Sequence, residues 1–154
     1  MARAESQYLR IFDSAGTTYA RWQSYYVGST VTWSSASWEY RPFGVSGLVS
    51  GTTGGASSLQ VSMPATPSAV DAIETALKNI RLVEISQYAF DPTVNNTTPQ
   101  SSQSLVASFI GEVVGASGDL TQLNFELGSI LSPVGAQVPP RKFTSILIGA
   151  PCRL

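Results

Sequence analysis

The stretch Leu120-Thr-Gln-Leu-Asn-Phe-Glu-Leu127 decides the fold class, because it is the clearest alternation of apolar and polar side chains in the chain. A period of two is typical of a strand with one face on a core and the other in water. Just before it, Ala116-Ser-Gly-Asp119 has the composition of a turn. The apolar segments Leu105–Ile110 and Glu112–Val114, which form one strand or two, precede that turn. The sequence therefore predicts an antiparallel hairpin here.

The first half of the chain predicts more strands of the same kind. Tyr8–Phe12 and Thr18–Trp22 are rich in strand-forming residues, and Asp13-Ser-Ala-Gly16 between them supplies the Asp and Gly of a turn. A second hairpin is therefore expected. Further short strands are expected at residues 25–27, 31–33, 38–40, 45–49, 59–63 and 81–86. The small-residue loop 51–57 and the polar loop 91–104 separate some of them, and loops as long as the second are usually functional or mobile.

One helix is expected, from about residue 68 to 80. Pro67 suits the first turn, and Ser68 with Asp71 three positions later resembles a capping box. Glu74 and Lys78 have the spacing of a favourable pair on the solvent face. The apolar stripe that should cover a sheet consists of Val70, Ile73, Leu77 and Ile80.

The last part of the chain, residues 128–154, differs from the rest. It is apolar but carries four prolines, which exclude a long helix or a central strand. We expect an extended arm that docks on a neighbouring subunit, and wrapping around its own sheet is the open alternative. The candidate interface residues are Ile130, Leu131, Val134, Val138, Pro139, Pro140, Arg141 and Phe143. The whole prediction is a β-rich α+β fold: residues 1–127 form an antiparallel β-sandwich or barrel-like sheet with one covering helix, followed by an extended C-terminal arm.

Composition restricts the classes of partner. Charged residues make up only 12% of the chain, whereas soluble domains usually carry about 25%. Surfaces covered by other subunits are poor in Lys and Glu, and here Arg outnumbers Lys seven to two.

The formal net charge of −1 argues against nucleic acid and against an anionic membrane as partners. No run of 18 apolar residues is present, and the N-terminus lacks the apolar stretch of a signal peptide, so we expect neither a transmembrane span nor a signal peptide. Cys152 is the only cysteine, which is compatible with synthesis in a reducing cytoplasm.

Catalytic chemistry is not indicated. The chain contains no histidine, and its ten carboxylates are scattered. We therefore expect no catalytic, cofactor-binding or metal-binding residues, and a protein that is not an enzyme. Two alternatives stay open. A hydrolase could bring two distant carboxylates together in the fold. A carbohydrate-binding module could present Trp33 and Trp38 in a solvent-facing row, although core packing explains these rings better.

The order of these segments carries a resemblance. Val31-Thr-Trp33, Trp38-Glu-Tyr-Arg-Pro-Phe43, the strand 59–63, the helix, and the ending Leu131-Ser-Pro-Val-Gly-Ala-Gln-Val-Pro-Pro-Arg-Lys-Phe143 are similar to the minor tail protein L family of long-tailed phages. Its lambda-like members continue into a cysteine-rich domain with an iron–sulfur cluster. Because this chain has Cys152 alone, no cluster is expected.

The resemblance implies a structural component of the virion, made in the host cytoplasm. It would sit in the tail tip or baseplate, where it joins the distal end of the tail tube to the central hub. The partners implied are the tube-end protein, the central hub or spike protein, and further copies in a threefold or sixfold homo-oligomeric ring.

Overall fold

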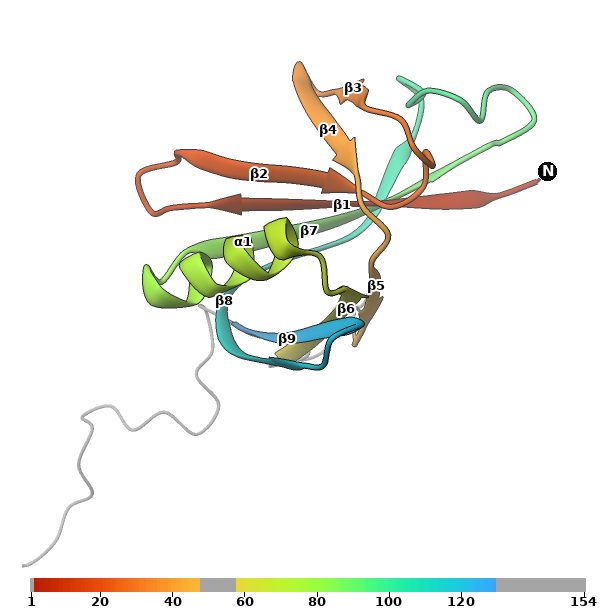
Figure 1. The fold of residues 1–154 in the computed structure, drawn as a ribbon. Coiled ribbons are helices and arrows are strands. Elements are labelled where there is room, and N and C mark those ends of the chain that lie inside the picture. Colours follow the sequence, from red (N-terminus) through yellow and green to blue (C-terminus); the bar gives the residue numbers. More distant parts are fainter. Residues whose placement is uncertain (1, 48–57, 130–154) are drawn as a thin grey trace, which may run out of the picture.

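The computed structural model describes residues 2–47 and 58–129, and their strands join into a nine-stranded open sheet (Figure 1). In spatial order the strands are β3-β4-β2-β1-β7-β8-β9-β6-β5, and all neighbours are antiparallel except β2 and β4. Their bounds are β1 Ala4–Phe12, β2 Thr18–Gln23, β3 Val31–Trp33, β4 Ala36–Tyr40, β5 Gly44–Ser46, β6 Ser58–Pro64, β7 Leu82–Phe90, β8 Ser104–Gly118 and β9 Gln122–Ser129. The helix α1 spans Pro67–Lys78. The expected β-rich α+β fold with one covering helix is confirmed.

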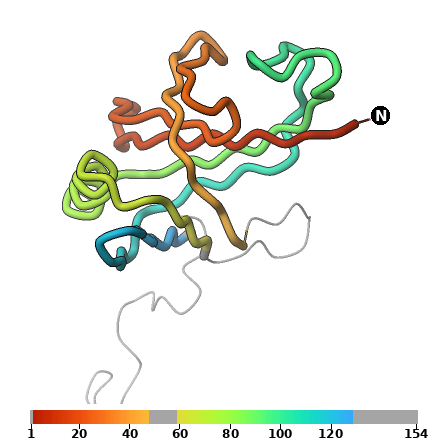
Figure 2. Tube along the Cα trace, turned by 45° about the vertical axis from the view of Figure 1, so that its right-hand side comes forward, coloured from red at the N-terminus to blue at the C-terminus, as the bar shows by residue number. Residues whose placement is uncertain are grey.

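The central strand β1 is covered on both faces. Leu9 and Ile11 lie in the larger core together with α1, β6, β7, β8 and β9. Tyr8 points to the other face, where it joins a smaller core with Tyr26, Val31 and Trp38. Figures 1 and 2 show how this arises, because the sheet curls around α1 on one side while the β3–β4 hairpin stands over the other.

The helix begins two residues earlier than a cap at Ser68 requires. Thr66 is the N-cap, and its side-chain oxygen accepts a hydrogen bond from the Ala69 backbone N–H at 3.3 Å. Pro67 takes the first helical position, where its lack of an N–H costs nothing. The predicted capping box at Ser68 and Asp71 was therefore wrong.

The buried face of α1 also differs from the predicted stripe. Its buried residues are Ala69, Ile73 and Ala76, whereas Leu77 and Ile80 are exposed. Small side chains at this contact let the helix lie close to the curled sheet. Ile80 lies beyond the helix end at a φ of 51°, so it cannot continue a helical stripe.

The segment 24–30 is a loop, although residues 25–27 were predicted to form a strand. The fully buried amide of Gln23 replaces strand pairing here. Its Nε2 donates to the carbonyl oxygens of Tyr26 and Ser29 at 2.8 and 3.0 Å. Its Oε1 accepts from the backbone N–H groups of Tyr25 and Tyr26 at 2.9 and 2.7 Å. One side chain therefore satisfies four backbone groups that would otherwise need a neighbouring strand.

The β8–β9 hairpin is confirmed, but its turn lies later than expected. β8 is a single 15-residue strand that continues through Gly111 to Gly118. The turn forms around Asp119, whose Oδ1 accepts from the backbone N–H groups of Thr121 and Gln122 at 2.7 and 2.8 Å. β9 therefore starts at Gln122 and ends at Ser129, two residues beyond the predicted domain end.

Gly111 is required by the close approach of β8 and β9. A Cβ at this position would collide with the carbonyl oxygen of Gly128 and lie 2.8 Å from the ring of Phe109. Gly115, in the same strand, has open space around its Cα. We expect Gly111→Ala to lower the free energy of unfolding by about 2–3 kcal/mol and Gly115→Ala by less than about 0.5 kcal/mol. Urea unfolding followed by circular dichroism measures both, and equal effects would contradict the packing described here.

Candidate functional site

A pocket of about 300 Å³ lies between the β3–β4 hairpin and the face of the sheet formed by β1, β2 and β7. We call it the hairpin pocket. Two cations, Arg10 and Arg21, and a wall of aromatic rings line this pocket. Its lining residues are Tyr8, Arg10, Arg21, Trp33, Ser34, Ala36, Trp38, Glu84, Ser86 and Tyr88.

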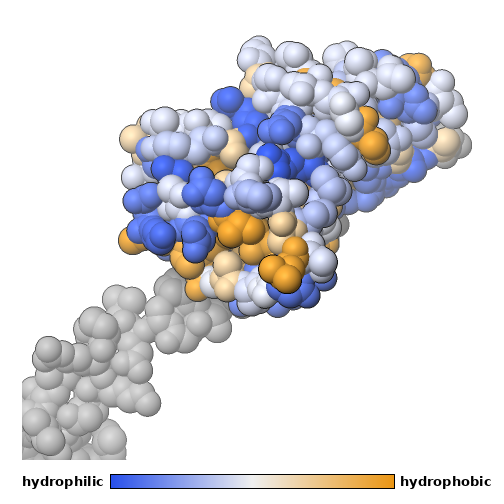
Figure 3. Space-filling view, in the orientation of Figure 1, coloured by the Kyte–Doolittle hydropathy of each residue, from blue (hydrophilic) through white to orange (hydrophobic). Residues whose placement is uncertain are grey.

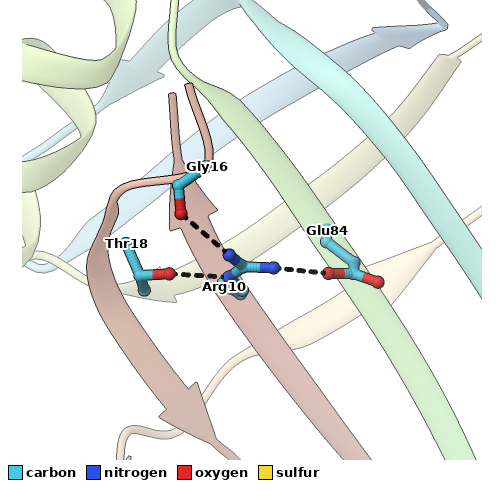
Figure 4. Close-up of polar contacts among 4 residues, drawn as sticks. All are labelled: Arg10, Gly16, Thr18 and Glu84. Carbon is cyan, nitrogen blue, oxygen red and sulfur yellow. Dashed lines mark hydrogen bonds and ion pairs between the residues drawn. The ribbon is translucent and has the colours of Figure 1, made fainter. Parts of the chain in front are cut away.

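Arg10 holds the floor of the hairpin pocket in place (Figure 4). Its Nη1 pairs with Glu84 Oε2 at 3.6 Å, its Nε donates to Thr18 Oγ1 at 2.8 Å, and its Nη2 donates to Gly16 O at 3.3 Å. The guanidinium also lies over the ring of Phe12, 4.5 Å from its centroid. Because these partners use most of its donors, Arg10 ties β7 to the β1–β2 hairpin and has little capacity left for a ligand.

Arg21 is different, because no acidic side chain of the described residues pairs with it. It lies directly opposite Arg10 in the β1–β2 pair. Glu84 neutralises Arg10, so Arg21 gives the pocket an excess of one positive charge. A half-buried unpaired cation favours an anionic group, either on a small molecule or on a neighbouring protein.

The aromatic wall consists of rings packed on one another. The Tyr8 ring contacts Trp38 edge-to-face at a centroid distance of 5.1 Å and Tyr88 at 5.6 Å. Trp33 contacts Tyr88 at 5.4 Å. Trp38 is buried and its indole N–H donates to the Trp33 carbonyl at 3.0 Å. The rings therefore form a cluster rather than a solvent-facing row, and only the half-buried Trp33 and Tyr88 offer ring surface to the pocket.

The turn at the rim of the pocket is strained. Ser34 and Ser35 have φ angles of 52° and 60°, which is the conformation of a two-residue hairpin turn that favours Asn and Gly. Two serines there cost some stability, and such costs often accompany a constrained function. Here the turn places the Ser34 hydroxyl at the pocket mouth.

Beside the pocket, polar side chains gather in the smaller core. The Tyr8 hydroxyl faces the side chains of Gln103, Ser6 and Tyr26. All four are buried, yet none of these polar ends makes a well-formed hydrogen bond within the described part of the chain. Burial raises the pKa of Tyr8 and that of Tyr26, so both phenols stay neutral at physiological pH. The loop 24–30 is held to the sheet by ring packing instead, because Tyr26 lies in the smaller core with Tyr8.

Reactive groups are sparse in the hairpin pocket. Glu84 is its single carboxylate and is already paired with Arg10. Residues 2–47 and 58–129 contain no cluster of three His, Cys, Asp or Glu side chains that could hold a metal ion. The pocket therefore offers the Arg21 cation, the side chains of Ser34 and Ser86, and aromatic rings, all of which can bind a ligand.

The candidate interface residues of the C-terminal arm, from Ile130 to Phe143, all lie outside the described residues. Their docking stays a prediction, as does the division into residues 1–127 and 128–154. The sequence had singled out Trp33 and Trp38 but not the groups around them. Arg21 and Glu84 are isolated charges in predicted strands, and only the register of β2, β1 and β7 brings them to one face.

No family model matches this chain, and no curated protein is significantly similar to it. Within the part of the chain that the structure describes, no helix is long and apolar enough to cross a membrane. The function must therefore be inferred from the residues of the chain itself.

Proposed function

We propose that this chain is a structural subunit of a bacteriophage tail tip or baseplate, which joins the distal end of the tail tube to the central hub. Its partners would be the tube-end protein, the hub or spike protein, and other copies in a threefold or sixfold ring. The protein would be part of the virion and have no catalytic activity. The resemblance to the minor tail protein L family is the reason for proposing a phage tail. One feature of the fold and one of the sequence support a role in assembly.

The observation that carries the proposal is the open edge of the sheet at β2. β4 pairs with β2 only at Trp22 and Gln23, so the outer edge of Thr18–Arg21 has no strand beside it among the described residues. Such an edge exposes backbone N–H and C=O groups that a strand from another subunit can pair with. Tyr19 on this edge is half exposed and lies under the guanidinium of Arg81.

The second feature is the division of charge along the chain. Residues 1–129 hold all ten acidic and six of the nine basic side chains, a formal charge of −4. Residues 130–154 hold the other three basic side chains and no acid, a formal charge of +3. These opposite charges favour contacts between the C-terminal segment of one subunit and the body of the next, which is the kind of contact that can build a ring.

Removal of residues 130–154 tests the proposal, because β9 ends at Ser129 and all nine strands of the described sheet lie before residue 130. We expect the truncated protein to fold, with a β-rich far-ultraviolet circular dichroism spectrum and a cooperative thermal unfolding transition. In the phage that encodes the chain, the same truncation should reduce the yield of complete tails by at least about tenfold, because the binding free energy lost at each joint adds up over the ring. Electron microscopy and infectious titre give the yield.

The control for this experiment is a phage that carries Val94→Ser, a change at an exposed apolar side chain in the loop after β7. It should assemble normally. Normal tails from the truncated chain would contradict a joining role for the C-terminal segment.

The hairpin pocket favours a second candidate, a module that binds an acidic sugar. Arg21 would face the carboxylate of the sugar, and Trp33 would lie against its apolar ring face. This candidate needs Trp33 and Arg21 to touch the ligand. It therefore predicts that changes at these two positions remove binding while the protein stays folded.

A further inference from the structure

A second concave surface lies between the start of α1 and the β8–β9 turn, on the side of the larger core. We call it the helix groove. Its volume is about 420 Å³, and it is lined by Ala65, Pro67, Val70, Asp71, Glu74, Asp119 and Leu120. Figure 3 shows apolar side chains gathered on this face, where Figure 1 draws α1 above the β8–β9 hairpin.

Leu120 is the unusual member of the groove. It is 99% exposed, more than any other large apolar side chain among the described residues. The turn that carries it is made by Asp119, Thr121 and Gln122, so the fold gives no reason for a leucine at this position. An apolar side chain that the fold does not use, at the edge of an apolar groove, indicates contact with another segment.

The groove is also acidic. Asp71, Glu74 and Asp119 line it, and none of them pairs with a cation of the described residues. The expected pair of Glu74 with Lys78 is not formed. Hydrogen bonds from the backbone N–H and hydroxyl of Thr121 and from the backbone N–H of Gln122 lower the pKa of Asp119, which keeps its carboxylate charged. The occupant of the groove should therefore be apolar and basic.

One segment of the chain has this composition. Residues 130–154 carry Arg141, Lys142 and Arg153 without any acid, and Phe143 follows the two adjacent cations. Arg141 follows Ser129 by twelve positions, which in extended form span about 40 Å. Ser129 pairs with Gly111, at the opposite end of β9 from the turn. Because the eight residues of β9 are only about 26 Å long, the segment can reach the groove of its own chain or that of a neighbouring copy.

We propose that the helix groove binds Arg141, Lys142 and Phe143 of the C-terminal segment. Phe143 lies against Leu120 and Val70, and the two cations face Asp71, Glu74 and Asp119. This inference rests on the joining role proposed above for residues 130–154 and names the surface that receives them.

Disulfide trapping tests the contact, because Cys152 is the only cysteine and can be removed. The full-length protein with Cys152→Ser, Leu120→Cys and Phe143→Cys is oxidised with a mild catalyst, and the bond is located by peptide mass spectrometry. The control replaces Leu120→Cys with Val94→Cys, at an apolar side chain that is also strongly exposed. We expect the bond between positions 120 and 143 to form at least about tenfold faster than the control bond, since docking raises the local concentration of the two thiols.

Charge reversal separates the electrostatic part. Asp71→Lys with Glu74→Lys should slow trapping by roughly fivefold, as expected when exposed ion pairs become repulsive. Adding Arg141→Glu and Lys142→Glu to the same protein should restore the rate, which a misfolded variant would not do.

The outcomes are distinguishable. Trapping at the rate of the control, or no recovery on charge exchange, overturns the groove assignment. If tails nevertheless fail without residues 130–154, the joining role stands and the segment docks elsewhere. Trapping between two chains, seen as a dimer on a non-reducing gel, supports both proposals. Trapping only within one chain supports the groove and contradicts the joining role.

Discussion

Replacing Gln23 with leucine is expected to lower the free energy of unfolding by about 3–5 kcal/mol. The change leaves two backbone N–H groups and two backbone carbonyl oxygens of the loop 24–30 without their partner. Each buried polar group left unsatisfied costs about 1–3 kcal/mol, and some relaxation of the loop reduces the sum. Urea unfolding monitored by tryptophan fluorescence measures the loss.

Two variants make the Gln23 prediction specific. Gln60→Leu changes an exposed glutamine of β6 in the same way and should alter stability by less than about 0.5 kcal/mol. Gln23→Glu keeps the acceptor for the two N–H groups but sets a carboxylate oxygen against two carbonyl oxygens. Protonation restores one donor, so this variant should gain stability relative to the wild type as the pH falls from 7 to 4. A loss for Gln23→Leu no larger than that for Gln60→Leu would contradict the organising role of this amide.

The second large effect is expected for Trp38→Ala, which should cost about 3–5 kcal/mol, as for other buried large aromatic side chains. The change removes the ring that packs on Tyr8 and the indole N–H that binds the Trp33 carbonyl. Trp38→Phe keeps most of the packing and loses the hydrogen bond, so about 1–2 kcal/mol is expected. Thermal unfolding with concentration-matched controls ranks the variants.

Trp33 distinguishes the two candidate functions. It is half buried, so Trp33→Ala should leave the protein folded at 25 °C. If the chain is an acidic-sugar-binding module, this variant and Arg21→Ala abolish binding on a glycan array that the wild type recognises. If the chain is a structural subunit, the wild type itself binds no glycan. Glycan binding that survives Trp33→Ala would rule out the hairpin pocket as a sugar site.

The strands and the helix follow from local patterns in the sequence. Strand-forming residues located β1 and β2, alternation located β6 and β9, and Pro67 with the following periodic segment located α1. The strand predicted at residues 25–27 was wrong because a buried side chain, Gln23, binds the backbone of the loop that follows it. Nothing in the pattern around Tyr25 reveals that Gln23 closes a loop there, and a polar residue in a strand is ordinarily placed on its solvent face.

The buried face of α1 was mispredicted for a related reason. Hydrophobicity favours leucine and isoleucine over alanine as contact residues, but the distance between helix and sheet decides which side chains fit. That distance is set by the curl of the sheet and selects Ala69 and Ala76. The hairpin pocket could not be predicted from the sequence either. Its charged residues Arg21, Arg10 and Glu84 come from three strands, and only the fold gives the register that aligns them.

The pairing of β1 with β7 has a consequence for how the molecule is made. Ala4 lies opposite Phe90 and Phe12 lies opposite Leu82, so the central ladder joins residues 70 to 86 positions apart. High contact order slows folding, because a long loop must close before the ladder gains any stability. During synthesis, the apolar face of the β1–β2 hairpin therefore stays uncovered until more than half of the chain has left the ribosome. Residues 9–38 contain no Lys or Glu, so few charges oppose aggregation of the nascent chain at this stage.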